Sequence, residues 1–185
     1  RIGIGTTFPN QSLDVVGSIY ASGNFKWNDT NGSILIGTLT GNTLDSVTAL
    51  GYSAGLANTK NSLTALGFHA GELNTGDYLT ALGYYSGWNN TGSQVTASGF
   101  QSAYNNKGNY VTSLGYDSAR DNTGSQVTAI GPNSAFQNTG NYSFGFGYGA
   151  LQANTGNNVV AIGYGAGQSN TDSNQFIVKH NIVNA

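Results

Sequence analysis

The feature that most constrains this chain is a period of 16 residues that runs through most of its length. Two columns keep this period without exception over eight units, one of glycine and one of asparagine. The glycines are Gly51, Gly67, Gly83, Gly99, Gly115, Gly131, Gly147 and Gly163. The asparagines are Asn58, Asn74, Asn90, Asn106, Asn122, Asn138, Asn154 and Asn170. A fixed period of this kind is the signature of a repeat architecture, in which each unit packs against its neighbours.

Each unit joins a short β-prone stretch to a turn-prone stretch. In the third unit, Leu79-Thr80-Ala81-Leu82 is the β-prone stretch and Asn90-Thr91-Gly92 is the turn, because Asn and Gly tolerate positive φ. We therefore predict one coil per unit, with two short strands and two turns. Eight coils stacked at ~4.8 Å would give a rod roughly 40 Å long. The expected fold class is all-β, a parallel β-solenoid.

Side-chain size predicts which residues face the narrow interior of such a coil. Small residues form two columns that we place inside, and residues of opposite parity would then point outward. The small residues are Ala49, Ala65, Ala81, Ala97 and Ala129, and Ala54, Ala70, Ser86, Ser102, Ser118 and Ser134. The outward apolar residues are Leu50, Leu66, Leu82, Leu114, Ile130, Phe144, Phe146 and Ile162. An exposed apolar stripe usually marks an interface, which favours a threefold axis of a homotrimer. The alternative is that this stripe is the internal core of a wider solenoid.

Two further columns have expected structural roles. We expect the Asn column to form a ladder, with each side chain bonded to the turn of the next coil. Aromatic rings recur one coil apart at Tyr52, Phe68, Tyr84, Phe100, Tyr116, Tyr148 and Tyr164, and Pro132 breaks this column. Stacked rings would seal the rod, and a sugar-binding platform is the alternative role for them.

The ends of the chain depart from the repeat. Residues 1–45 lie outside the register and are assigned to an N-terminal module and cap, in which Ile36-Gly37 resembles a degenerate first coil. Residues 46–172 form the eight coils. Residues 173–185 are assigned to a C-terminal capping segment that contains the strand Gln175-Phe176-Ile177-Val178, because solenoids need caps at their open ends.

The repeated T-A-L-G-Y, T-A-I-G and V-A-I-G segments, with Ala or Ser three residues after the glycine, resemble the head repeats of trimeric autotransporter adhesins. That resemblance implies a left-handed parallel β-roll and an intertwined or side-by-side homotrimer, although the family's usual period is shorter than 16. The N-terminal runs Ile2–Pro9 and Leu13–Ile19 look like a module common in phage tail fibres and in large bacterial surface proteins. Together these resemblances imply an extracellular location, on a virion tail fibre or a bacterial cell surface.

Composition argues against several classes of function. The chain has 6 basic and 8 acidic residues and a net charge of −2, which offers no basic patch for a nucleic acid. It has no Cys, and its acidic residues do not recur coil after coil in one column, whereas a metal-loaded solenoid needs acids in register. No apolar run approaches the length of a membrane span. No base or orienting acid accompanies its serines. We therefore expect no enzyme activity, no catalytic residue, no cofactor, no metal, no nucleic-acid partner and no insertion into a membrane.

The remaining hypothesis is a structural and adhesive fibre segment that binds a glycan or a protein on a host surface. Columns that vary from coil to coil would contact the receptor, and aromatic residues are favoured anchors. The candidate contacts are Trp88, Tyr104, Tyr85, Arg120 and Phe136. Two alternatives of another class are an ice-binding solenoid, from the Thr column that Lys107 interrupts, and a polysaccharide depolymerase, which needs a carboxylate pair that the sequence does not clearly offer.

Overall fold

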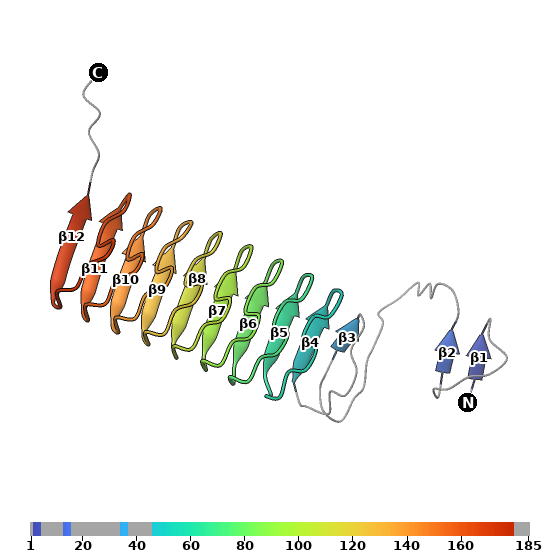
Figure 1. The fold of residues 1–185 in the computed structure, drawn as a ribbon. Helices are drawn as coiled ribbons and strands as arrows, with labels where there is room; N and C mark the ends of the chain where they lie inside the picture. The colour runs from blue at the N-terminus through green and yellow to red at the C-terminus, as the bar shows by residue number, and fades with distance from the viewer. Residues whose placement is uncertain (1, 5–12, 16–33, 37–45, 180–185) are drawn as a thin grey trace, which may run out of the picture.

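The computed structural model describes residues 2–4, 13–15, 34–36 and 46–179, and it describes only the backbone of the first three ranges. It confirms an all-β parallel solenoid with coils of about 16 residues, seen as a row of parallel arrows in Figure 1. One sheet contains ten strands, and a second pairs β1 with β2. The strands are β1 Ile2–Ile4, β2 Leu13–Val15, β3 Ile34–Ile36, β4 Val47–Leu50, β5 Leu63–Leu66, β6 Leu79–Leu82, β7 Val95–Ser98, β8 Val111–Leu114, β9 Val127–Ile130, β10 Ser143–Phe146, β11 Val159–Gly163 and β12 Gln175–Lys179.

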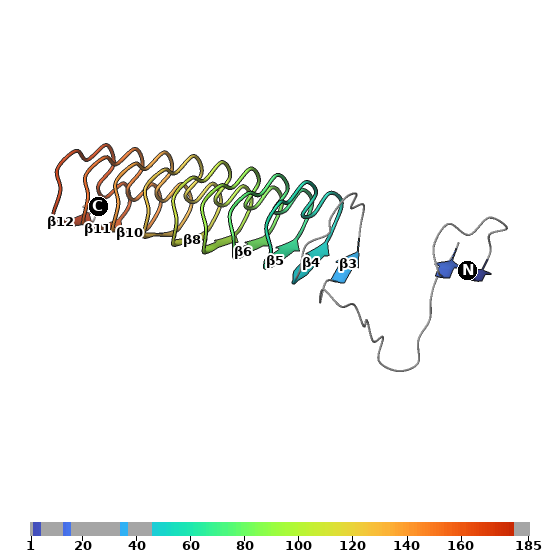
Figure 2. The same cartoon turned by 90° about the horizontal axis from the view of Figure 1, so that it is seen from below.

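Each coil contains one strand, and the expectation of two strands per coil is wrong. In the coil that starts with β7, three consecutive four-residue turns run from Gly99 to Asn106, each closed by an N–H→O hydrogen bond of 3.2–3.5 Å. The third residue of each turn has positive φ, at Gln101, Ala103 and Asn105, as in type II turns. The sheet therefore lies along one side of the solenoid and the turns along the other, as Figure 2 shows.

The glycine column is explained by close contact between coils at the corner that follows each strand. Gly83 has φ +131°, and a Cβ atom added to it would lie 2.5 Å from the carbonyl oxygen of Gly99 in the next coil. The same conflict recurs from Gly51 to Gly163. A side chain at this corner would both strain the backbone and push the coils apart, which accounts for the absence of exceptions.

The interior is filled by the two predicted columns of small residues and by a third column. Ala81 and Ser86 have no exposed surface, as do most members of their columns. The third column consists of the first residue of each strand, mainly Val and Leu, and it supplies most of the largest fully buried side chains. The sequence pattern did not predict the role of this column. The outward stripe lies outside, with Leu50 49% and Phe146 50% exposed, so the alternative of a wider solenoid with this stripe as its core is wrong.

The coil that starts with β10 fills its interior in a different way. Ser143 and Gly145 stand where most other coils have Val or Leu and Ala, which leaves space beside the strand. Leu151 occupies that space from the turn side and has no exposed surface. A Cβ added to Gly145 would lie 3.1 Å from Cδ1 of Leu151. One large side chain on the turns therefore replaces volume lost from the strand.

Strands at both ends of the ten-stranded sheet continue its parallel pairing. At the N-terminal end, Ile36 of β3 pairs with Leu50 of β4, 14 residues further on, and Gly37 lies outside the described residues. At the C-terminal end, β12 pairs with β11 in the register of the coils, and Ile177 packs against the core. The strand β12 therefore extends the sheet. The rest of the assigned N-terminal module, and residues 180–185 of the C-terminal segment, lie outside the described residues.

Candidate functional site

The Asn column forms a continuous ladder of side-chain amides inside the rod. Asn106 Nδ2 donates to Asn90 Oδ1 at 2.9 Å and to the carbonyl oxygen of Gly108 in its own coil at 2.8 Å. Its own Oδ1 accepts from Asn122 Nδ2 at 2.8 Å. Each amide therefore bonds to the Asn of the adjacent coil and to its own turn, whereas we expected a bond to the turn of the next coil. These buried amides are satisfied by each other, so they hold the framework and offer no surface to a ligand.

The outer face of the sheet carries no charged side chain from β4 to β11 and combines a column of hydroxyl residues with a mainly apolar column. From β4 to β11 its outward residues are Thr, Leu, Ile, Val, Phe and one Ser. Near the C-terminal end the Thr and Leu columns give way to Phe144 and Phe146, which are 37% and 50% exposed. We call this surface the sheet face. Large apolar side chains therefore lie exposed along this surface, and such patches usually mark an interface.

Aromatic residues border the sheet face on both sides. Along one border, the rings of the predicted aromatic column stack face to face, with centroids 5.1–5.4 Å apart between successive rings. Along the other border, Tyr78, Tyr110 and Tyr142 are 56–62% exposed. Because each stacked ring covers the face of the next, the aromatic column presents ring edges to solvent. That geometry suits packing against a protein surface more than flat stacking of a sugar.

A second row of side chains, which we call the turn ridge, runs along the turns. It consists of Glu72, Trp88, Tyr104, Arg120 and Phe136, one from each of five successive coils. Trp88 and Tyr104 stack with centroids 4.6 Å apart and planes 15° from parallel. The guanidinium of Arg120 lies 5.4 Å from the Tyr104 ring and 5.8 Å from the Phe136 ring. Trp88 Nε1 donates to Glu72 Oε2 at 3.2 Å.

The structure brings four predicted receptor contacts together in the turn ridge and places the fifth beside it. Tyr85 packs against Trp88 edge-on at 6.2 Å and stacks on His69 at 4.7 Å. His69 in turn contacts Glu72 through its Nδ1 atom. Both faces of the Tyr104 ring are covered, by Trp88 and Arg120, so a ligand meets the edges of this ring. Receptor contact by these residues stays a prediction.

The single positive charge of Arg120 is shared between the carboxylates of Asp117 and Asp121. Arg120 lies 3.5 Å from Asp117 Oδ1 and 3.6 Å from Asp121 Oδ2, and its Nη1 donates to Gln101 Oε1 at 3.0 Å. Asp117 is 7% exposed, and its Oδ1 has no hydrogen-bond partner among the described residues. Burial raises the pKa of Asp117 above its usual value, and the charge of Arg120 only partly opposes that effect. This cluster ties three neighbouring columns of side chains together.

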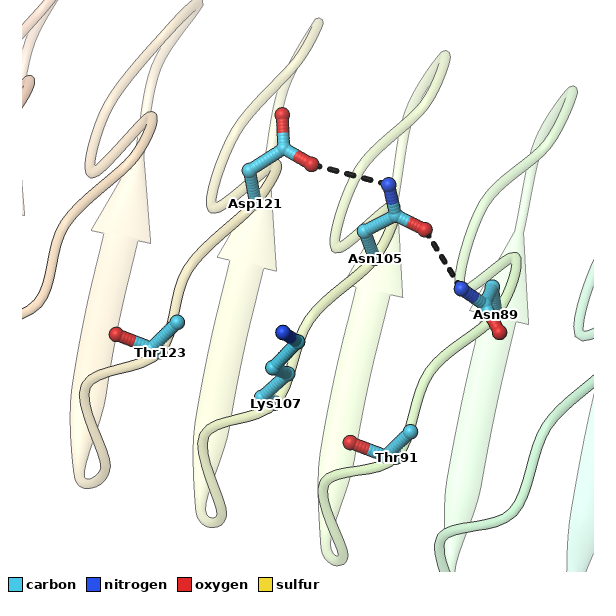
Figure 3. A pocket seen from close by; sticks show the side chains of 6 residues that line it. All are labelled: Asn89, Thr91, Asn105, Lys107, Asp121 and Thr123. Atoms are coloured by element: carbon cyan, nitrogen blue, oxygen red, sulfur yellow. Dashed lines mark hydrogen bonds between the residues drawn. The ribbon is translucent and has the colours of Figure 1, made fainter.

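Beside the turn ridge lies a hollow of about 250 Å³, which we call the polar groove. One wall carries Asn89, Asn105 and Asp121, and the other carries Thr91, Lys107 and Thr123. Figure 3 shows the two rows facing each other across three coils, with dashed lines along the first row. Asn89 Nδ2 donates to Asn105 Oδ1 at 2.9 Å, and Asn105 Nδ2 donates to Asp121 Oδ1 at 3.1 Å. No residue of this groove was predicted from the sequence as a site.

Residues with other chemistry do not gather into a site within the part of the chain that the structure describes. No three His, Cys, Asp or Glu side chains there stand close enough to hold a metal ion. None of the described residues forms a helix long and apolar enough to span a membrane. Comparison with protein-family models, with curated proteins and with solved structures gave no match to this chain.

Proposed function

We propose that this chain is a structural and receptor-binding segment of a trimeric extracellular fibre, with a phage tail fibre as the first candidate and a bacterial surface adhesin as the second. The observation that carries the proposal is the sheet face, an uncharged surface from β4 to β11 with a continuous, mainly apolar column that includes exposed Leu and Phe side chains. The resemblance of the N-terminal segment to tail-fibre modules favours the first candidate. The rod then acts as a spacer that displays receptor contacts along its turns.

The size of the sheet face supports burial against copies of the same chain. Eight strands at ~4.8 Å spacing, each four residues wide and bordered by aromatic rings, present on the order of 800 Å² per subunit. A stable protein–protein interface buries about that area on each partner. Because the face lacks charge, identical copies meet there without like-charge repulsion. In a parallel arrangement, equivalent apolar residues of each copy would also lie at the same height along the fibre axis.

A threefold arrangement fits the two-sided form of the coil. Three sheet faces turned toward a common axis would bury the outward columns, with Phe144 and Phe146 packed near the C-terminal end. The turns lie on the opposite side of the coil, so the turn ridge would stay exposed around the fibre. For the coil itself we propose the left-handed form that the adhesin heads imply.

Sedimentation equilibrium on the intact chain tests this proposal. We expect a trimer at micromolar concentration and a shift toward monomers in the double variant Leu82→Asp and Leu114→Asp, which places two carboxylates on the sheet face of each chain. The matched control is Thr75→Asp with Thr139→Asp, two exposed positions on the turns, and it should remain trimeric. A wild-type chain that is a folded monomer at this concentration would overturn the proposal.

A further inference from the structure

The polar groove lies where the Thr column of the repeat is broken and the facing column carries three successive Asn or Asp residues. In the column that contains Lys107, the other seven coils have Thr. In the facing column, which has no fixed residue, Asn89, Asn105 and Asp121 stand between Leu73 and Gln137 of the flanking coils. The departures converge on the three coils that line the hollow. The rod does not need these residues to fold, because coils with other residues in these columns have the same fold.

The hydrogen bonds within the groove leave one cation without a balancing charge. Asp121 accepts from the Asn105 amide and lies 3.6 Å from Arg120 Nε, the cation that it shares with Asp117. The ammonium group of Lys107 makes no hydrogen bond or ion pair with any described residue. It is exposed and lines the hollow together with the hydroxyls of Thr91 and Thr123. An anion that enters the groove on the Lys107 side therefore meets a cation flanked by two hydroxyls, while Asp121 on the opposite wall is held by Asn105 and Arg120.

We propose that the polar groove binds an extended acidic polysaccharide, with an anionic group of one sugar on Lys107 and the hydroxyls of its neighbours on Asn89, Thr91 and Thr123. Polar groups repeat along the groove at the coil spacing of ~4.8 Å, which suits a chain molecule whose hydroxyls also repeat. A single cation is too few for the phosphates of a nucleic acid. The groove lining lacks the apolar side chains that an extended peptide would need. The proposal rests on the proposed function, because it names the receptor class that the outer side of the fibre would recognise.

Titration calorimetry on the assembled wild-type protein tests the groove with three hexasaccharides: oligogalacturonate, its full methyl ester, which lacks the charge, and a sulfated galactan. We expect the charged oligomers to bind about two- to fivefold more tightly than the ester, as an exposed ion pair allows. The sulfated and carboxylated probes identify which anion is preferred. Lys107→Thr restores the residue of the other coils, so its fold is preserved, and it should lower the affinity for the charged oligomers to that of the ester.

Lys60→Thr is the matched control, because it removes an exposed lysine from a coil outside the groove, and it should leave all affinities unchanged. The proposal is overturned if neither charged oligomer binds, if Lys107→Thr binds as the wild type does, or if Lys60→Thr has an equal effect. Sedimentation of the same samples separates this result from the proposed function. Trimers without binding overturn the groove alone, whereas Lys107-dependent binding by a monomer overturns the trimeric fibre alone.

Discussion

Replacement of Leu151 by Ala tests how one coil compensates for missing core volume. Leu151 is fully buried, and it lies against Gly145, which has no side chain to move into a cavity. A Leu→Ala change in a core costs about 3–5 kcal/mol when the surroundings cannot collapse. We therefore expect a cost in the upper half of that range, and a shift of about 10 °C in the thermal midpoint for a chain of this size, measured by far-UV circular dichroism.

A triple variant provides the sharper test of the same reasoning. Ser143→Val, Gly145→Ala and Leu151→Ala together copy Val127, Ala129 and Ala135 of the preceding coil. The triple variant should recover most of the stability that Leu151→Ala loses, because it moves the volume back to the strand. Ser143→Val with Gly145→Ala alone should overpack the coil and cost about 1–3 kcal/mol. The reasoning is refuted if Leu151→Ala costs less than about 1 kcal/mol or if the triple variant is no more stable than the single one.

Three further substitutions test the core, the ladder and the charge cluster. Ala81→Leu should overpack its coil by about 1–3 kcal/mol, and an unchanged thermal midpoint would contradict the inward position of Ala81. Asn106→Asp removes a buried donor and should cost about 3 kcal/mol or more in urea unfolding, whereas Asn157→Asp, at an exposed acceptor, should cost little. The raised pKa of Asp117 means that its contribution to stability is fully present when it is protonated and is lost as pH rises through that pKa. Acidification from about pH 7 to about pH 4 should therefore raise the unfolding midpoint of the wild type relative to Asp117→Asn, and parallel pH profiles would contradict this.

The period and the side-chain parity were sufficient to predict a solenoid with Ala81 inside and Leu82 outside. They could not predict one strand per coil, because the turns place residues such as Gln101 and Ala103 at positive φ. Residues with a Cβ rarely adopt that conformation, and hydrogen bonds between coils stabilise it here. For instance, Gln101 N donates to Tyr84 O at 2.9 Å and Ala103 N donates to Ser118 O at 2.8 Å. Those bonds depend on the stacked coils and leave no local signal in the sequence.

The candidate site could also be predicted only in part from the repeat pattern. Trp88 and Tyr104 share a column, so the sequence placed them one coil apart, and the structure stacks them. The polar groove could not be predicted, although Lys107 breaks the Thr column. That Lys107 faces the column of Asn105 depends on the path of the turns, which the repeat pattern does not specify. Departures from the consensus of each column, compared coil by coil, were the signal that could have located the groove.

Distances between spin labels test the burial of the sheet face most directly. The chain has no Cys, so a single introduced cysteine gives one label per subunit. Thr112→Cys labels the middle of the sheet face, and Thr139→Cys labels the turns. The trimeric account predicts label separations of about 10–20 Å at the first site, since packed sheets lie about 10 Å apart, and clearly longer separations at the second. An absence of dipolar coupling at Thr112→Cys, or shorter separations at Thr139→Cys, would contradict burial of the sheet face at a threefold axis.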